Sequence, residues 1–179
     1  MNEDEIYSYI KNPQSKRYGF DLLIKHSQRK MYSIIRRMVY SHEDTNDILQ
    51  NSLLKAWEHI DSFKGKSSLD TWLYRIATNE TLNFLKQKRI HQFISLGLVA
   101  HKLEDQIENP LHYEGSEIEK KLQKALLQLP KKQRLVFNLR YFEEMKYEQI
   151  AEILGTSVGA LKASYHIAEQ KIQMNLKKQ

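Results

Sequence analysis

The 179-residue sequence contains no cysteine, and this absence removes several kinds of chemistry at once. Without thiols there is no disulfide, no thiolate metal site and no cysteine nucleophile, which fits a reducing cytoplasm. Glycine and proline are scarce, with six and three residues. Because strands need turns and turns depend on these two residues, an all-β fold is disfavoured.

Long hydrophobic runs and targeting signals are also missing. The least polar stretch, residues 94–100, is far too short to cross a bilayer, and the first five residues are acidic where a secretory signal would be basic. We therefore expect a cytoplasmic protein without membrane insertion.

Enzyme motifs are absent as well. The chain has no phosphate-binding loop, no dinucleotide-binding fingerprint, and no zinc-protease or serine-hydrolase motif. Its seven histidines never lie three to five residues apart, as a helical metal site would require. We expect no catalytic residue, no metal and no cofactor.

The residues that are present predict a helical, basic protein. Hydrophobic residues make up 41% of the chain, enough to bury a core, and the net charge is +6, which points to a polyanionic partner. In the first half we expect helices over residues 15–40, 43–60 and 68–89. Their inward residues are expected to be Phe20, Leu23, Ile24, Met31, Ile34, Ile35 and Met38; Leu49, Leu53, Ala56, Trp57 and Ile60; and Leu69, Leu73 and Ile76.

The second half predicts four short helices, over residues 117–129, 131–142, 146–154 and 157–174. The stripe of the first of them is expected to be Ile118, Leu122, Ala125, Leu126 and Leu129. Between the halves, residues 101–119 are acidic and contain one basic residue. The sequence therefore predicts an all-α fold of two small helical domains, residues 1–90 and 115–179, joined by an acidic linker over residues 91–114.

The strongest local pattern is at residues 147–161. Ala151 allows a second helix to cross closely, and Gly155, four residues later, suits the turn of a helix-turn-helix. In that motif the second helix enters the major groove of DNA, where Lys162, Ser164, Tyr165 and His166 could reach bases or phosphates. The alternative is a plain helical hairpin that touches no nucleic acid.

Two polar helix faces stand out in the first half. Arg75, Asn79, Asn83 and Lys86 share one face of the third helix, near Trp72 and several cations, a combination suited to single-stranded nucleic acid. On the second helix, Leu54 lies on a polar face opposite the predicted apolar stripe. The first face could equally be a solvated surface with Trp72 in the core, and a single exposed leucine needs no explanation unless it belongs to a protein-binding patch.

These motifs occur together in one family. The chain resembles the extracytoplasmic function (ECF) group of bacterial sigma factors, the promoter-specificity subunits of RNA polymerase, over residues 16–89 and 117–174. The resemblance is carried by residues 47–51 and 54–57, by residues 63–65 and 71–79, and by residues 129–137 leading into the helix-turn-helix. It implies a non-enzymatic protein that docks on core polymerase, recognises the minus-10 and minus-35 promoter elements and helps to melt the minus-10 region.

The resemblance also implies a role for each surface. Docking on the clamp of the largest polymerase subunit would use Asp47, Gln50, Asn51 and Leu54. The minus-10 element, duplex and single-stranded, would meet Phe63, Lys64, Lys66, Arg75, Asn79, Asn83, Lys86 and Arg89. The minus-35 element would meet Ser157, Lys162, Ser164, Tyr165, His166 and Lys171. The second domain would also contact the flap of the second-largest subunit, and an anti-sigma factor is a further expected partner.

Two other hypotheses stay open at this point. One is a helix-turn-helix regulator that binds duplex DNA without being a polymerase subunit, and the other is a helical module that binds proteins only. The recognition helix has few cations, Lys162 and Lys171, which predicts weak binding of promoter duplex by the isolated chain.

Overall fold

The computed structural model describes residues 2–94 and 116–177. Both ranges consist of helices and the loops that connect them, and neither contains a strand, so the all-α prediction is confirmed. The first range forms α1 (Glu3–Lys11), α2 (Lys16–Val39), α3 (His42–His59), a 3-10 turn (Ile60–Ser62) and α4 (Leu69–Ile94). The second forms α6 (Glu117–Leu127), α7 (Lys131–Phe137), a π-helical turn (Asn138–Phe142), α8 (Tyr147–Leu154) and α9 (Val158–Lys177).

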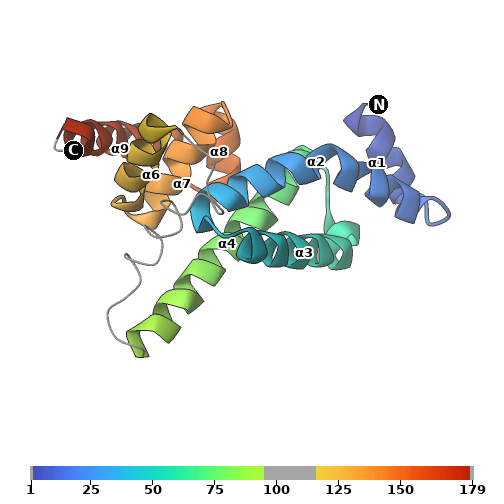
Figure 1. Ribbon diagram of the computed structural model, residues 1–179. Coiled ribbons are helices and arrows are strands. Elements are labelled where there is room, and N and C mark those ends of the chain that lie inside the picture. Colours follow the sequence, from blue (N-terminus) through green and yellow to red (C-terminus); the bar gives the residue numbers. More distant parts are fainter. Residues whose placement is uncertain (1, 95–115, 178–179) are drawn as a thin grey trace.

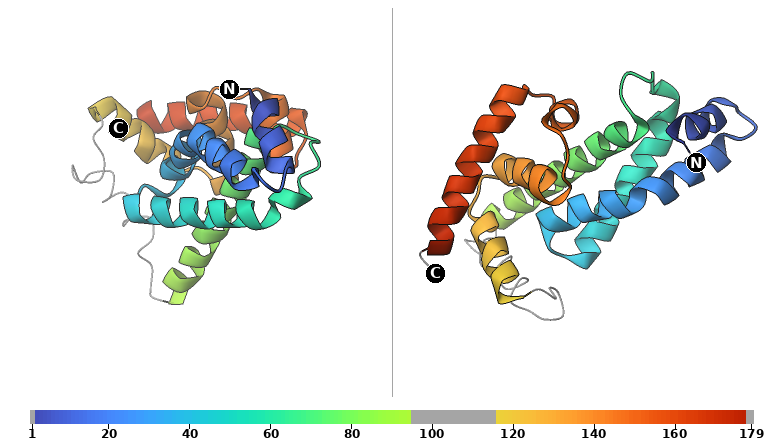
Figure 2. Two further views of the ribbon diagram at one scale, coloured as in Figure 1. Left: turned by 90° about the vertical axis from the view of Figure 1, so that its right-hand side faces the viewer. Right: turned by 90° about the horizontal axis from the view of Figure 1, so that it is seen from above.

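The first half is a bundle of α2, α3 and α4, with α1 packed against the start of α2 (Figure 1). The last turns of α4 project away from the bundle, and α6 to α9 gather around the other end of α2 (Figures 1 and 2). Residues 91–94, expected in the linker, continue α4 instead. The rest of the predicted linker lies outside the described residues.

The buried face of α3 differs from the predicted one. It is formed by Thr45, Ile48, Ser52, Ala56 and Ile60. The Thr45 and Ser52 hydroxyls donate to carbonyls one turn earlier, at 2.6 and 2.7 Å, so they are satisfied inside the core. The prediction was wrong for Trp57, which is 40% exposed, and only partly right for Leu49 and Leu53, which are half-buried. Small side chains on the buried face let α3 pack closely and leave the large ones at its edge.

Two other differences lie at helix starts. Helix α1 was not expected, although Asn2 and Glu5 form a capping box that begins it. Ile118, expected in the inward stripe of α6, is 80% exposed. The reason is that α6 is buried only from its second turn onward, at Gln123, Ala125 and Leu126.

The two halves pack directly against each other, through polar contacts and through a shared apolar core. The Tyr40 hydroxyl donates to Gln123 Oε1 at 2.9 Å, and a guanidinium nitrogen of Arg134 donates to the Met38 carbonyl at 3.2 Å. Arg134 is buried, and this burial lowers the pKa of its guanidinium below the ordinary value. Apolar residues of α7 and α8, among them Ile150, join the core of the first half beneath these contacts. The predicted domains are therefore in contact along α2 and α4.

Candidate functional site

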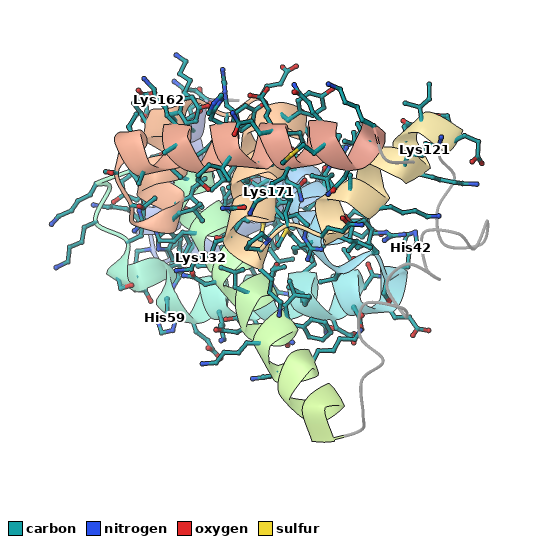
Figure 3. The ribbon with its side chains drawn as sticks, turned by 90° about the vertical axis from the view of Figure 1, so that its left-hand side faces the viewer. His42, His59, Lys121, Lys132, Lys162 and Lys171 are labelled. Carbon is teal, nitrogen blue, oxygen red and sulfur yellow. The ribbon has the colours of Figure 1, made fainter. Side chains whose placement is uncertain are left out.

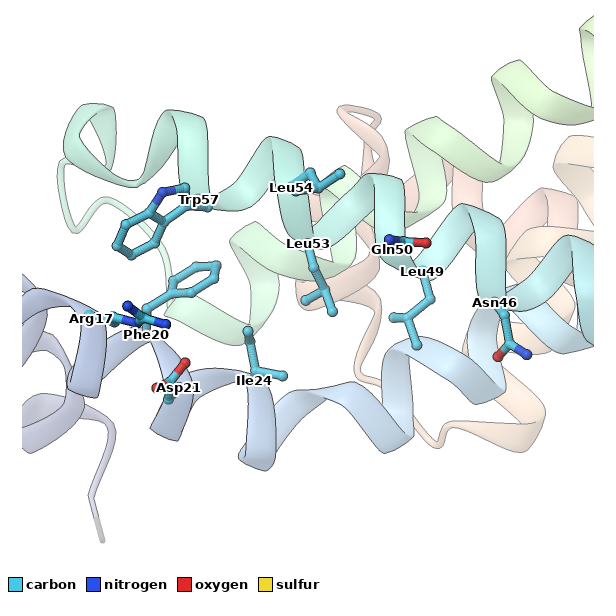
Figure 4. A pocket seen from close by; sticks show the side chains of 10 residues that line it. All are labelled: Arg17, Phe20, Asp21, Ile24, Asn46, Leu49, Gln50, Leu53, Leu54 and Trp57. Carbon is cyan, nitrogen blue, oxygen red and sulfur yellow. The ribbon is translucent and has the colours of Figure 1, made fainter.

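An apolar groove of about 590 Å³ opens between α2 and α3. Phe20 and Trp57 meet in it edge to face, with ring centroids 5.0 Å apart, and Leu53 and Ile24 lie beside them (Figure 4). Lys16 sits over the Trp57 ring, 5.0 Å from its centroid. The centres of protein-binding surfaces are rich in apolar and aromatic side chains, as this open groove is.

The predicted docking residues divide at this groove. Leu54, 55% exposed, and Gln50 line it (Figure 4). Asp47 and Asn51 are exposed on α3 without lining it. The sequence reasoning missed most of the groove, because Leu49, Leu53 and Trp57 were assigned to the core. A tryptophan on the same face as two leucines of an amphipathic helix was the available signal, but it fits a buried position equally well.

A second candidate surface is formed by the loop of residues 63–68 and one face of α4. Phe63 is half-buried, with its ring 5.5 Å from that of Trp72, which also packs against the core. Lys64 and Lys66 are exposed on the loop, and Gly65 between them has a φ of 67°, which favours glycine. The loop ends where Ser68 caps α4 by accepting a hydrogen bond from the Thr71 amide at 3.0 Å.

The α4 residues of this surface differ in their exposure to solvent. Asn79, Asn83 and Lys86 are exposed along one face, while Arg75 is half-buried. The side chain of Arg89 lies outside the described residues. Two ion pairs, Lys55 with Glu80 at 2.7 Å and Lys88 with Asp44 at 2.6 Å, instead connect α3 to α4. The exposed face therefore offers amides and a cation, the side-chain types that hydrogen-bond to bases and phosphates.

The third candidate surface is the helix-turn-helix of α8 and α9. Gly155 ends α8 in the left-handed conformation, with a φ of 61°, and Ser157 caps α9 by accepting from the Ala160 amide at 3.2 Å. Ile150 and Leu161 are buried between the two helices. The predicted helix-turn-helix, with Gly155 at its turn, is confirmed.

The predicted residues of α9 do not all point outward. Ser157, Lys162 and His166 are exposed, and Ser164 is half-buried. Tyr165 stacks on Phe137 with ring centroids 5.4 Å apart, and burial raises the pKa of its hydroxyl.

The cations of the second half are not gathered along α9. Lys171 donates to Gln133 of α7 at 3.2 Å. Figure 3 shows Lys162 near one end of α9, while Lys121 and Lys132 come from α6 and α7. The outward face of α9 is therefore weakly basic.

The described ranges contain no group of three histidine or acidic side chains that could hold a metal ion. None of the described helices is both long and apolar enough to cross a membrane.

The described residues combine an apolar groove, an amide-rich helix face and a helix-turn-helix, which are the kinds of surface that bind a protein and nucleic acid. Residues 23–90 match sigma-70 region 2, and residues 119–172 match sigma-70 region 4. Among the relatives, the ECF RNA polymerase sigma-E factor of Haemophilus influenzae is 32% identical over 170 residues, covering 89% of this chain and 88% of that one. The RNA polymerase sigma-H factor of Pseudomonas aeruginosa is 32% identical over 167 residues, covering 88% and 86%.

The fold is also that of a solved sigma factor. RpoE of Bartonella quintana, determined in complex with the anti-sigma factor NepR, superimposes with a TM-score of 0.69 at 23% identity, covering 88% of this chain and 96% of that one. The chain belongs to the sigma-70 family, in its ECF group. It is therefore a non-enzymatic sigma factor that binds core RNA polymerase and promoter DNA and directs transcription initiation.

Proposed function

We propose that the groove between α2 and α3 is where this sigma factor docks on the clamp of the largest polymerase subunit. The observation that carries the proposal is the exposed Leu54 beside an open apolar groove, flanked by the amide of Gln50. A buried leucine contact and a paired amide together suit the well-packed centre of an interface. Asp47 and Asn51, exposed on the same helix, would lie at its polar rim.

We expect Leu54→Ala combined with Gln50→Ala to weaken binding to core polymerase by roughly tenfold or more. Loss of the leucine contact and of the amide hydrogen bond would each cost about 1–2 kcal/mol. Competition for core polymerase against a labelled wild-type chain measures the effect. Asn51→Ala, on the same helix but outside the groove, should cost less. Unchanged affinity of the double variant with a normal circular dichroism spectrum would remove this assignment.

The loop of residues 63–68 and the exposed face of α4 form the proposed minus-10 surface. Asn79 and Asn83 can each donate and accept hydrogen bonds at the edge of an unpaired base, and Lys64, Lys66 and Lys86 suit phosphates. On α9, exposed Ser157, Lys162 and His166 form the proposed minus-35 surface. Ser164, Tyr165 and Lys171, which are half-buried, would position the helix or contact its edge.

Use of both DNA surfaces on one promoter requires the halves to separate. The two elements lie about 25 base pairs apart, or ~85 Å at ~3.4 Å per base pair. Here α8 contacts both α4 and α9, which leaves roughly 20 Å between the axes of the two DNA-facing helices. The compact arrangement therefore belongs to the chain before it engages a promoter.

Run-off transcription tests the function as a whole. Core polymerase supplemented with this chain should initiate at its promoters, whereas core polymerase alone should not. A helix-turn-helix regulator would bind DNA without conferring initiation. The proposed surroundings are the cytoplasm, where polymerase and promoter meet, with contact to the flap of the second-largest subunit and restraint by an anti-sigma factor. The complex of the similar sigma factor with an anti-sigma factor supports that last partner.

A further inference from the structure

Helix α1 lies outside the segment that matches sigma-70 region 2, which begins at residue 23. It is nevertheless firmly attached, because Ile6 and Ile10 are buried against the bundle. A Cβ atom at Gly19 of α2 would come within 2.7 Å of the Ile10 nitrogen, so the glycine allows the close crossing of α1 and α2. The position of α1 is therefore fixed by packing.

The part of α1 next to Ile6 and Ile10 contacts the loop of residues 63–68 and the residue that follows it. The Tyr7 ring meets Phe63 edge to face, with centroids 5.4 Å apart, and its hydroxyl lies 3.5 Å from the Phe63 carbonyl oxygen, to which it donates. The same tyrosine borders Gly65, where its hydroxyl would be 3.6 Å from an added Cβ. The Glu3 carboxylate accepts a hydrogen bond from the Leu69 amide, at the positive end of α4.

These contacts hold the loop at its beginning and hold the residue after its end, and Tyr7 borders its middle, while Lys64 and Lys66 stay exposed. Before the loop, Lys16 pairs with Asp61 at 2.6 Å. Fixing a residue of a flexible backbone costs conformational entropy. A loop that is already ordered before DNA arrives does not incur that cost on binding, and this is the usual advantage of preorganisation.

We propose that α1 positions the loop of residues 63–68 for opening of the minus-10 region, with Tyr7 and Glu3 as positioning residues. The inference rests on the proposed minus-10 surface and adds to it an element that the matched family segment does not contain. Tyr7 touches the loop and not the groove between α2 and α3, so its removal should leave polymerase docking intact.

Hydrogen exchange of the isolated full-length chain tests the positioning itself. Tyr7→Ala should accelerate amide exchange in residues 63–69 by roughly tenfold. Loss of the Tyr7 contacts should lower the free energy of local opening of the loop, and a decrease of about 1.4 kcal/mol raises the open population tenfold. Tyr9→Ala is the matched control: Tyr9 lies on the same helix, packs on Tyr18 at 5.3 Å and does not touch the loop. Equal exchange of the loop in the two variants would overturn the proposal.

Strand opening by the holoenzyme tests the consequence. On a promoter that the holoenzyme uses, Tyr7→Ala should slow the appearance of permanganate-reactive thymines by roughly three- to tenfold. A template with a pre-formed minus-10 bubble should restore most of the rate, and Tyr7→Phe, which keeps the ring, should stay close to wild type. A defect of equal size on duplex and bubble, or none on either, would overturn the role of α1.

Asn79→Ala separates this inference from the function on which it rests. If α4 reads the opened strand, Asn79→Ala slows opening whatever α1 does. A defect in Asn79→Ala with normal opening in Tyr7→Ala would reject the inference and keep the minus-10 surface. Normal opening in Asn79→Ala would instead count against the surface itself, and the exchange experiment would still decide whether α1 orders the loop.

Discussion

The interior of the first half and the contact between the two halves differ in composition: the first is apolar, whereas the second combines apolar side chains of α7 and α8 with hydrogen-bonded polar groups. Within the bundle, Met31, Ile35, Leu73 and Ala77 are fully buried apolar side chains. Between the halves, hydroxyl, amide, guanidinium and carboxylate groups carry much of the contact, at Ser33, Tyr40, Gln123, Arg134, Asn138 and Glu143. A polar cavity of about 440 Å³, lined by Lys30, Asp70 and Gln149 among others, lies along the same boundary.

This difference indicates which contacts are suited to change. Apolar residues leaving a core lose the hydrophobic contribution with nothing in return, whereas polar groups leaving an interface regain hydrogen bonds to water. A net contribution of about 0.5–1.5 kcal/mol per hydrogen bond makes the contact between the halves adjustable by a partner. Separation of the halves would also expose apolar residues of α7 and α8 such as Ile150, so a partner must offset that loss of burial before the second half can move to a promoter position.

The largest expected effect comes from the bundle interior. Leu73→Ala removes a side chain with no exposed surface and should lower the free energy of unfolding by about 2–5 kcal/mol, through lost burial and a cavity. Urea denaturation followed by circular dichroism measures this loss. A change under ~1 kcal/mol would mean that burial in the bundle interior contributes no more to stability than the contact between the halves.

A smaller effect is expected at the centre of the contact between the halves. Arg134→Ala removes the donor to the Met38 carbonyl and should destabilise the compact arrangement by about 1–3 kcal/mol. The radius of gyration from small-angle scattering should rise while helix content stays constant. Arg140→Ala is the control, because Arg140 donates to the Met145 carbonyl inside the second half, at 2.9 Å. A radius that rises equally in both variants would contradict the interface role.

The smallest effect is expected at the edge of the same contact. Glu143 accepts from the Ser33 hydroxyl at 2.6 Å and lies 3.7 Å from the Arg37 guanidinium. Glu143→Gln keeps an acceptor for Ser33 but loses the charge, so the compact form should weaken by about 0.5–1 kcal/mol. A double-mutant cycle with Arg37→Gln, followed by scattering, isolates that pair. A coupling energy of zero would show that the ion pair contributes nothing.

Much of this architecture follows from the sequence, and the exceptions have physical causes. Periodicity predicted α2, α3, α4 and the helix-turn-helix, with Gly155 and Ser157 at their caps. It misassigned Trp57, because an amphipathic helix does not reveal whether its apolar edge meets its own core or an open groove. It missed α1, whose nine residues are short for an isolated helix and depend on packing against α2.

The contact between the halves was beyond sequence reasoning for a similar reason. Arg134 is a surface residue type, and nothing local to it indicates that a distant carbonyl on α2 makes burial tolerable. The three proposed surfaces were predicted as helix faces, but the burial of their individual side chains was not predicted. Arg75, Tyr165 and Lys171 proved half-buried once the neighbouring helices were in place.

Direct measurement of the distance between the halves tests the central claim that the compact chain opens on polymerase. The absence of cysteine allows two introduced labels without background, for example at exposed Gln28→Cys on α2 and Gln173→Cys on α9. Energy transfer between them should report a short, single distance in the isolated chain. In a holoenzyme bound to an active promoter the distance should lengthen by tens of ångströms, on the order of the ~85 Å between the two elements. An unchanged distance in a complex that initiates transcription would contradict the account.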